Sequence, residues 1–135
     1  MILTGDALYE AALRALDHPD ETDAGRFGPI SVDVHVGFEE RRIVESGEHL
    51  VVDALETIDM PADLAALLTG RSTHMRDGLF MPAGWIDPGY SGRLKLEFGN
   101  TSDGAAVIDG REAAGRLVFF RLDRETRGYD GRYGE

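Results

Sequence analysis

The feature that most constrains the fold is a period-two alternation of apolar and polar residues in short segments. The clearest example is residues 92–98, where Leu94, Leu96 and Phe98 alternate with three charged side chains. Residues 30–36 alternate Ile and Val with Ser, Asp and His in the same way. Successive side chains of a strand point to opposite faces, so both segments indicate strands with one buried face. Further short strands are expected at residues 42–45, 49–53, 105–108 and 116–122.

Only one segment has a clear helical pattern. Leu8, Ala12, Leu13 and Leu16 recur at helical spacing, which predicts a short amphipathic helix over residues 6–17. Residues 59–68 fit either a helical turn opened by a proline or a turn that leads into a strand. We therefore expect residues 1–126 to form one all-β domain, jelly-roll or barrel-like, with a short N-terminal helix. Residues 127–135 are expected to form a mobile tail.

Composition narrows the classes of function. The net charge is −11, with 14 basic and 25 acidic residues, which argues against nucleic acid as the main partner. There is no cysteine, so disulfides, thiolate nucleophiles and cysteine-based zinc sites are excluded. No apolar run suits a bilayer and no leader pattern stands at the start, so a cytoplasmic protein without membrane association is expected. Lys95 is the only lysine, and this acidic, arginine-based composition favours a halophile, with an acidic mesophilic protein as the alternative.

One turn carries groups that suit phosphate oxygens. Gly70 is followed by Arg71, Ser72 and Thr73, which offer a guanidinium fork, hydroxyls and backbone N–H groups. Arg76 follows Ser72 at helical spacing and is a candidate for the same anion. An ordinary polar turn with a surface charge is the alternative interpretation.

Two carboxylates follow at short spacing. Asp87 precedes Pro88-Gly89, so a turn fixes its backbone while its side chain remains free to act as a general base or to cap the turn. Tyr90 is either a packing residue or a flat surface for a sugar or base. Glu97 lies on the polar face of the strand 92–98, and it is a proton-transfer group if that face lines a cleft. A solvated polar face is the alternative.

The same residues carry a family resemblance. The segment 70–73, GRST, resembles the phosphate-binding GRSS motif of the dUTPase and dCTP deaminase superfamily. The segment 83–90, AGWIDPGY, resembles both the AGVIDxDY motif of dUTPases and the RIDPGW motif of the deaminases. The segment 96–100, LEFGN, is similar to the deaminase LEFxN, and MIL at the start with ISVDV at 30–34 resembles the deaminase N-terminal pattern.

The resemblance implies a distorted jelly roll of the dUTPase-like β-clip kind, a homotrimer with interfacial active sites, and Mg²⁺ held mainly by the triphosphate and water rather than by protein ligands. It implies that Asp87 activates water, that Glu97 shuttles protons in deamination, and that a dUTP or dCTP substrate meets a defined set of residues. That substrate set is Arg71, Ser72, Thr73, Arg76, Ala83, Gly84, Trp85, Ile86, Tyr90, Tyr129 and Arg132. The tail at 127–135 is expected to close over the nucleotide.

Departures from the family patterns point in two directions. Gly84-Trp85 stands where deaminases usually have His-Arg, and Tyr90 stands where they have Trp. Ala83-Gly84 and Tyr90 are what dUTPases have. Glu97, Arg76 and the N-terminal pattern follow the deaminases. We therefore expect a dUTP diphosphatase, of an archaeal type built on the deaminase lineage, that releases dUMP and diphosphate. Zinc-independent dCTP deamination, alone or with dUTP cleavage, is the alternative, and a non-catalytic nucleotide-binding homologue is a third.

Overall fold

The structure is a computed structural model that describes residues 1–17, 26–131 and 133. Its elements in chain order are α1 (Gly5–Ala15), β1 (Val32–His35), β2 (Arg42–Val44), β3 (His49–Asp59), β4 (Leu64–Gly70), α2 (Ser72–Arg76), β5 (Leu79–Phe80), β6 (Gly84–Ile86), β7 (Ser91–Asn100), β8 (Ala106–Ile108) and β9 (Ala113–Arg121). None of the described helices is long and apolar enough to span a bilayer.

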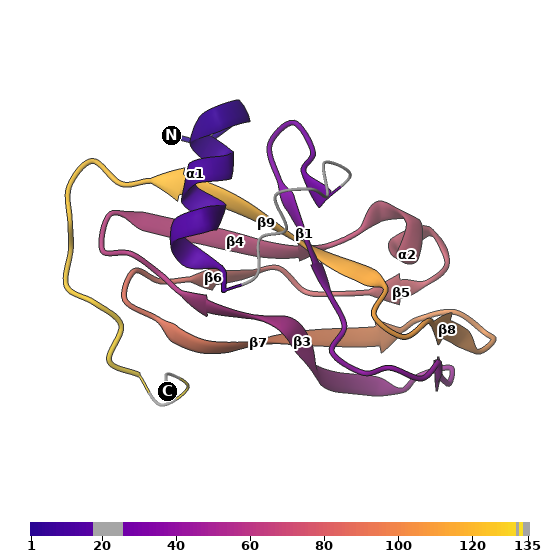
Figure 1. The fold of residues 1–135 in the computed structure, drawn as a ribbon. Coiled ribbons are helices and arrows are strands. Elements are labelled where there is room, and N and C mark those ends of the chain that lie inside the picture. The colour runs from indigo at the N-terminus through magenta and orange to yellow at the C-terminus, as the bar shows by residue number, and fades with distance from the viewer. Residues whose placement is uncertain (18–25, 132, 134–135) are drawn as a thin grey trace.

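The strands form antiparallel sheets that pack around one core. The order is β1-β9-β4-β6 in the largest sheet, β3-β7-β5 in a second and β2-β8 in a small third one. Figure 1 shows α1 standing beside this β domain and the chain after β9 running along one side of it. The expectation of an all-β domain with one N-terminal helix is confirmed.

The alternating segments build the core as expected. On β7, Leu94, Leu96 and Phe98 are at most 3% exposed, while the charged residues between them face outward. On β1, Val32 and Val34 are fully buried. Each of these strands therefore sits with its apolar face inward because only that register removes the apolar side chains from water.

The ambiguous segment 59–68 is resolved in favour of the strand. Residues Leu64–Gly70 form β4, which lies between β9 and β6, so the alternative of a helical turn is wrong. A strand with neighbours on both sides satisfies its backbone through the two ladders, and here Leu68 pairs with Gly84 on one side and Leu117 on the other.

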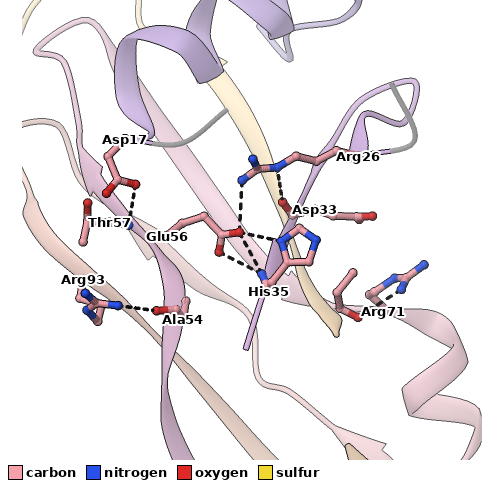
Figure 2. A network of polar contacts seen from close by, with 10 residues as sticks. Asp17, Arg26, Asp33, His35, Ala54, Glu56, Thr57, Arg71 and Arg93 are labelled. Atoms are coloured by element: carbon pink, nitrogen blue, oxygen red, sulfur yellow. Dashed lines mark hydrogen bonds and ion pairs between the residues drawn. The ribbon is translucent and has the colours of Figure 1, made fainter. Parts of the chain in front are cut away.

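A buried carboxylate ties the edge strand β1 to β3. Glu56 on β3 is 1% exposed and accepts hydrogen bonds from the backbone N–H of His35 at 2.9 Å and from Arg26 Nη2 at 3.2 Å. The His35 ring Nδ1 lies 2.7 Å from the same carboxylate (Figure 2). The β1–β9 register shifts at Val34/His35, so Glu56 satisfies an N–H group at an irregularity in the ladder.

Candidate functional site

A hollow lies between the β6 segment and the outward face of β7. Its volume is about 800 Å³. Residues 81–87 form one wall, and Arg93, Lys95 and Glu97 of β7 form another, with Val51 of β3 beside them. Tyr90, Tyr129 and Tyr133 complete the lining. The polar face of β7 therefore lines a cleft, which is the condition that sequence reasoning set for a chemical role of Glu97.

Asp87 stands at the rim of this hollow on a firmly held turn. The Tyr90 N–H donates to Asp87 O at 3.2 Å, and Met60 exchanges backbone hydrogen bonds with Gly89 and Tyr90 at 2.9 and 2.8 Å. Gly89 has φ +82, a conformation that favours glycine. The turn thus fixes the backbone of Asp87, whose side chain is exposed to the hollow.

Glu97 lines the hollow together with Arg93 and Lys95, and His49 lies beside its carboxylate. Its carboxylate is 48% exposed and lies 3.7 Å from His49 Nε2. Lys95, two residues earlier on the same face of β7, is ion-paired with Asp53 across the β3–β7 ladder. Arg93 donates from Nη1 to Ala54 O at 3.1 Å. Arg93 and Lys95 therefore place two basic side chains beside Glu97 on the β7 wall, and Lys95 is paired with Asp53.

The wall formed by residues 81–87 supplies backbone groups and aromatic surface. Ala83, Gly84 and Trp85 are exposed and Ile86 is 8% exposed with its side chain in the core. The Trp85 ring is 64% exposed and packs on Phe120 with ring centroids 5.2 Å apart. An indole therefore stands where the family resemblance leads one to expect an arginine.

The C-terminal segment contacts the same turn. The Tyr129 N–H donates to Pro88 O at 2.7 Å, and the Tyr129 ring meets the Tyr90 ring edge-on at 5.2 Å. The Tyr129 hydroxyl accepts a hydrogen bond from the Tyr133 N–H at 3.1 Å. Arg132, the remaining predicted tail residue, lies outside the described residues. Closure of this tail over a nucleotide stays a prediction.

The predicted phosphate-binding residues do not line this hollow. Arg71 follows the end of β4, and Ser72, Thr73 and Arg76 lie on α2, with all three exposed. Ile86 pairs with Ala66, which puts Asp87 beside Ala65, six residues from Arg71 along the strand direction. At about 3.3 Å per residue the two side chains start about 20 Å apart. One chain therefore does not bring Arg71 and Asp87 together.

Arg71 is held by the start of β9. Its Nη1 donates to Ala113 O at 3.1 Å, and its Nε is buried with no hydrogen-bond partner among the described residues. Next to it, His74 Nε2 lies 2.5 Å from Glu112 Oε1. His35, His49 and His74 each meet a glutamate from a distant segment. No local spacing signals such pairs.

Residues 11–122 match a family model described as dCTP deaminase-like. Among curated relatives, the chain is 37% identical over 112 residues to "dCTP deaminase, dUMP-forming" of Aquifex aeolicus, covering 76% of this chain and 62% of the relative. It is 34% identical over 90 residues to the protein of the same name from Methanoculleus marisnigri, covering 65% and 48%. The chain spans about half to three fifths of the length of these relatives.

Solved structures show the same fold. The 2′-deoxycytidine 5′-triphosphate deaminase of Agrobacterium tumefaciens aligns with a TM-score of 0.77 at 19% identity, over 90% of this chain and 49% of that one. The dUTPase of Staphylococcus bacteriophage 80alpha with dUPNHPP aligns with a TM-score of 0.62 at 20% identity, over 88% and 83%. The expected dUTPase-like jelly roll is therefore confirmed as the fold.

Proposed function

Since the chain belongs to the dCTP deaminase-like family, we propose that it converts dCTP to dUMP, by zinc-independent deamination followed by loss of diphosphate. The observation that carries the proposal is that Asp87 and Glu97 line one hollow. Two carboxylates on two walls suit two hydrolytic steps on one nucleotide. The names of the curated relatives support this order of preference over dUTP cleavage alone, which the sequence favoured.

In the first step, Glu97 takes a proton from water, the water oxygen adds to C4 of the cytosine, and the proton is passed to the departing amino group, which leaves as ammonia. An exposed strand carboxylate is able to reach a base that lies along the β7 wall. In this proposal the backbone of residues 83–86 reads the uracil or cytosine edge, because these residues line the same hollow.

In the second step, Asp87 orients a water molecule for attack on the α-phosphate, and diphosphate leaves. Arg71 and Ser72 hold phosphate oxygens in this proposal. Carboxylate and phosphate oxygens are the ligands that Mg²⁺ prefers, so the exposed Asp87 and the triphosphate fit that ion, which would neutralise phosphate charge when bound.

The separation of Arg71 from Asp87 supports a site shared between copies of the chain, and we propose a homotrimer on this ground. Mixing tests it directly. Arg71→Ala and Asp87→Asn are each expected to release no diphosphate. A refolded mixture of the two variants is expected to regain part of the diphosphate release, because some interfaces receive one intact group of each kind. A mixture as inactive as its parents argues against shared sites.

A second candidate, dUTP cleavage alone, is favoured by one observation. Trp85 presents an indole packed on Phe120 where deaminases usually have an arginine. The pure protein is incubated with Mg²⁺ and dCTP or dUTP in molar KCl, and the products are separated. dUMP and ammonia from dCTP support the first proposal, and dUMP from dUTP with inert dCTP supports the second.

Two variants assign the steps. Glu97→Gln is expected to abolish ammonia release while dUTP cleavage continues, and Asp87→Asn is expected to abolish diphosphate release. Retained deamination in Glu97→Gln removes Glu97 from the role proposed for it. Nucleotide binding with no product from either substrate leaves only a non-catalytic homologue.

A further inference from the structure

Helix α2 is fastened to the turn between β8 and β9 by a pair of ionisable side chains. The His74 side chain is 13% exposed and that of Glu112 is 24% exposed, and His74 Nε2 contacts Glu112 Oε1. The second carboxylate oxygen of Glu112 accepts the Asp109 N–H at 2.9 Å. The Glu112 backbone carbonyl accepts the Val36 N–H at 3.0 Å. The carboxylate that meets His74 is therefore fixed on both sides.

The same turn also holds Arg71. Its Nη1 donates to the carbonyl of Ala113, the residue after Glu112. Arg71 is the N-cap residue that precedes α2 and has an extended backbone, and His74 lies three residues later within the helix. Their contacts fall on adjacent residues of β9 and of the turn before it, and the two contacts brace α2 as a unit.

These contacts leave Arg71 with a defined orientation. Nη1 is engaged by Ala113 through one N–H and Nε is buried, so Nη2 and the second N–H of Nη1 are the donors left to meet a ligand. Recognition of phosphate by a guanidinium depends on the orientation of its planar fork. A small rotation of α2 would move this edge and the neighbouring Ser72 hydroxyl together.

Burial of His74 has a free-energy cost that burial of an apolar side chain would not have. Its Nδ1 is buried with no hydrogen-bond partner among the described residues. Whether the ring is neutral with its proton on Nε2 or is charged, Nε2–H donates to Glu112 while Nδ1 gains nothing. A leucine would fill similar space without this penalty. The contact with Glu112 is the feature that offsets it.

Resting on the phosphate role given to Arg71 and Ser72 in the proposed function, we propose that His74 and Glu112 are positioning residues that hold α2 so that both groups meet the polyphosphate of the substrate. They act through Arg71 and touch no reacting atom. The role predicts an effect on the phosphate part of the ligand and not on the nucleoside part.

The test compares His74→Leu, Glu112→Ala and the double variant with Arg41→Ala as matched control. Arg41 pairs with Asp109 on the exposed side of the same turn, with side chains 69% and 64% exposed. Calorimetry measures binding of an α,β-imido analogue of dUTP and of dUMP. Both single variants are expected to lose about tenfold in affinity for the analogue, with unchanged dUMP affinity and a KM effect larger than the kcat effect.

The pairing makes two further demands on the data. The double variant is expected to be no weaker than the worse single variant, and Glu112→Gln, which keeps an acceptor for His74 Nε2, is expected to recover part of the affinity. Arg41→Ala is expected to bind both ligands as the unmodified protein does.

Equal losses for the analogue and for dUMP overturn the proposal and leave a purely structural pair. An unmodified protein that does not bind the analogue also overturns it. A protein that binds the analogue with the expected variant pattern, yet turns over neither dCTP nor dUTP, supports this inference while the proposed function fails. The two are therefore separable.

Discussion

The substitution Glu56→Ala probes a buried polar interaction inside the domain. The Glu56 carboxylate is 1% exposed and receives hydrogen bonds from Arg26, itself 6% exposed, and from the His35 backbone. Its removal breaks the buried ion pair with Arg26 from one side and leaves the His35 N–H without this acceptor. Breaking a buried ion pair from one side costs about 3–5 kcal/mol, and leaving a buried N–H without its acceptor costs about 1–3 kcal/mol. Against a total stability of about 5–15 kcal/mol, a loss of about 3–5 kcal/mol is a fifth of the total or more.

Urea unfolding followed by far-ultraviolet circular dichroism measures this cost at fixed protein concentration. The matched control is Asp53→Ala, on the same strand three residues earlier, whose carboxylate pairs with Lys95 in solvent. An exposed pair of this kind contributes about 0.2–1 kcal/mol. We therefore expect the Glu56 variant to unfold at a clearly lower urea concentration than the control.

A double variant tests the electrostatic part of the reasoning. Arg26→Met with Glu56→Leu removes both charges, and buried pairs replaced by apolar groups are often neutral in stability. The double variant is expected to be more stable than Glu56→Leu alone, although His35 still lacks its acceptor. A cost below about 1 kcal/mol for Glu56→Ala, or equal costs for Glu56→Ala and Asp53→Ala, would refute the argument.

Two further predictions concern the ends of the chain. Arg14 donates to both carboxylate oxygens of Asp63 and holds the Asp63 pKa below its usual range. The ion pair therefore stabilises the fold above the unfolded pKa of about 3.9, and its contribution is lost as pH falls through the lower pKa of the folded state. The pair is partly exposed, so Asp63→Asn is expected to cost under about 1 kcal/mol at neutral pH, and its Tm deficit is expected to vanish in acid. In Gly89→Ala, the new Cβ would lie 2.7 Å from Gly128 Cα, and the φ of residue 89 is +82, so the contact between the turn and the C-terminal segment is weakened. Trypsin is therefore expected to cleave the C-terminal segment faster. The control Gly104→Ala, whose Cβ would meet no atom within 4 Å, is expected to leave cleavage unchanged.

The strands that were predictable are those with one covered face. On β7 and β1 the sheet leaves one side polar, so the alternation is written in the sequence. β4 lies between two strands, and its residues are buried or half-buried along its whole length. Covering of both faces removes the alternation, and a short apolar run then fits a helix or a strand equally well.

The helix α2 was not predicted, because its five residues make no apolar stripe and none of them is buried. Its position is set by His74 and Arg71 contacts with residues 38 and 42 positions away. Such contacts depend on which strands pair and in what register, and a single sequence does not state either. The same reason hid the pairing of Glu56 with His35.

The candidate site shows how sequence proximity differs from spatial proximity. Arg71 and Asp87 are sixteen positions apart, and the residues between them form α2, β5 and the returning strand β6. The chain reverses direction between β4 and β6, because these strands are antiparallel. Asp87 therefore lies beside the start of β4, whereas Arg71 follows its end. The motif order therefore names candidate residues without showing which of them lie in one pocket of a single chain. A phosphate chain held at Arg71 lies about 20 Å from the Asp87 of its own chain, so a second copy must supply the missing group if both act on one nucleotide.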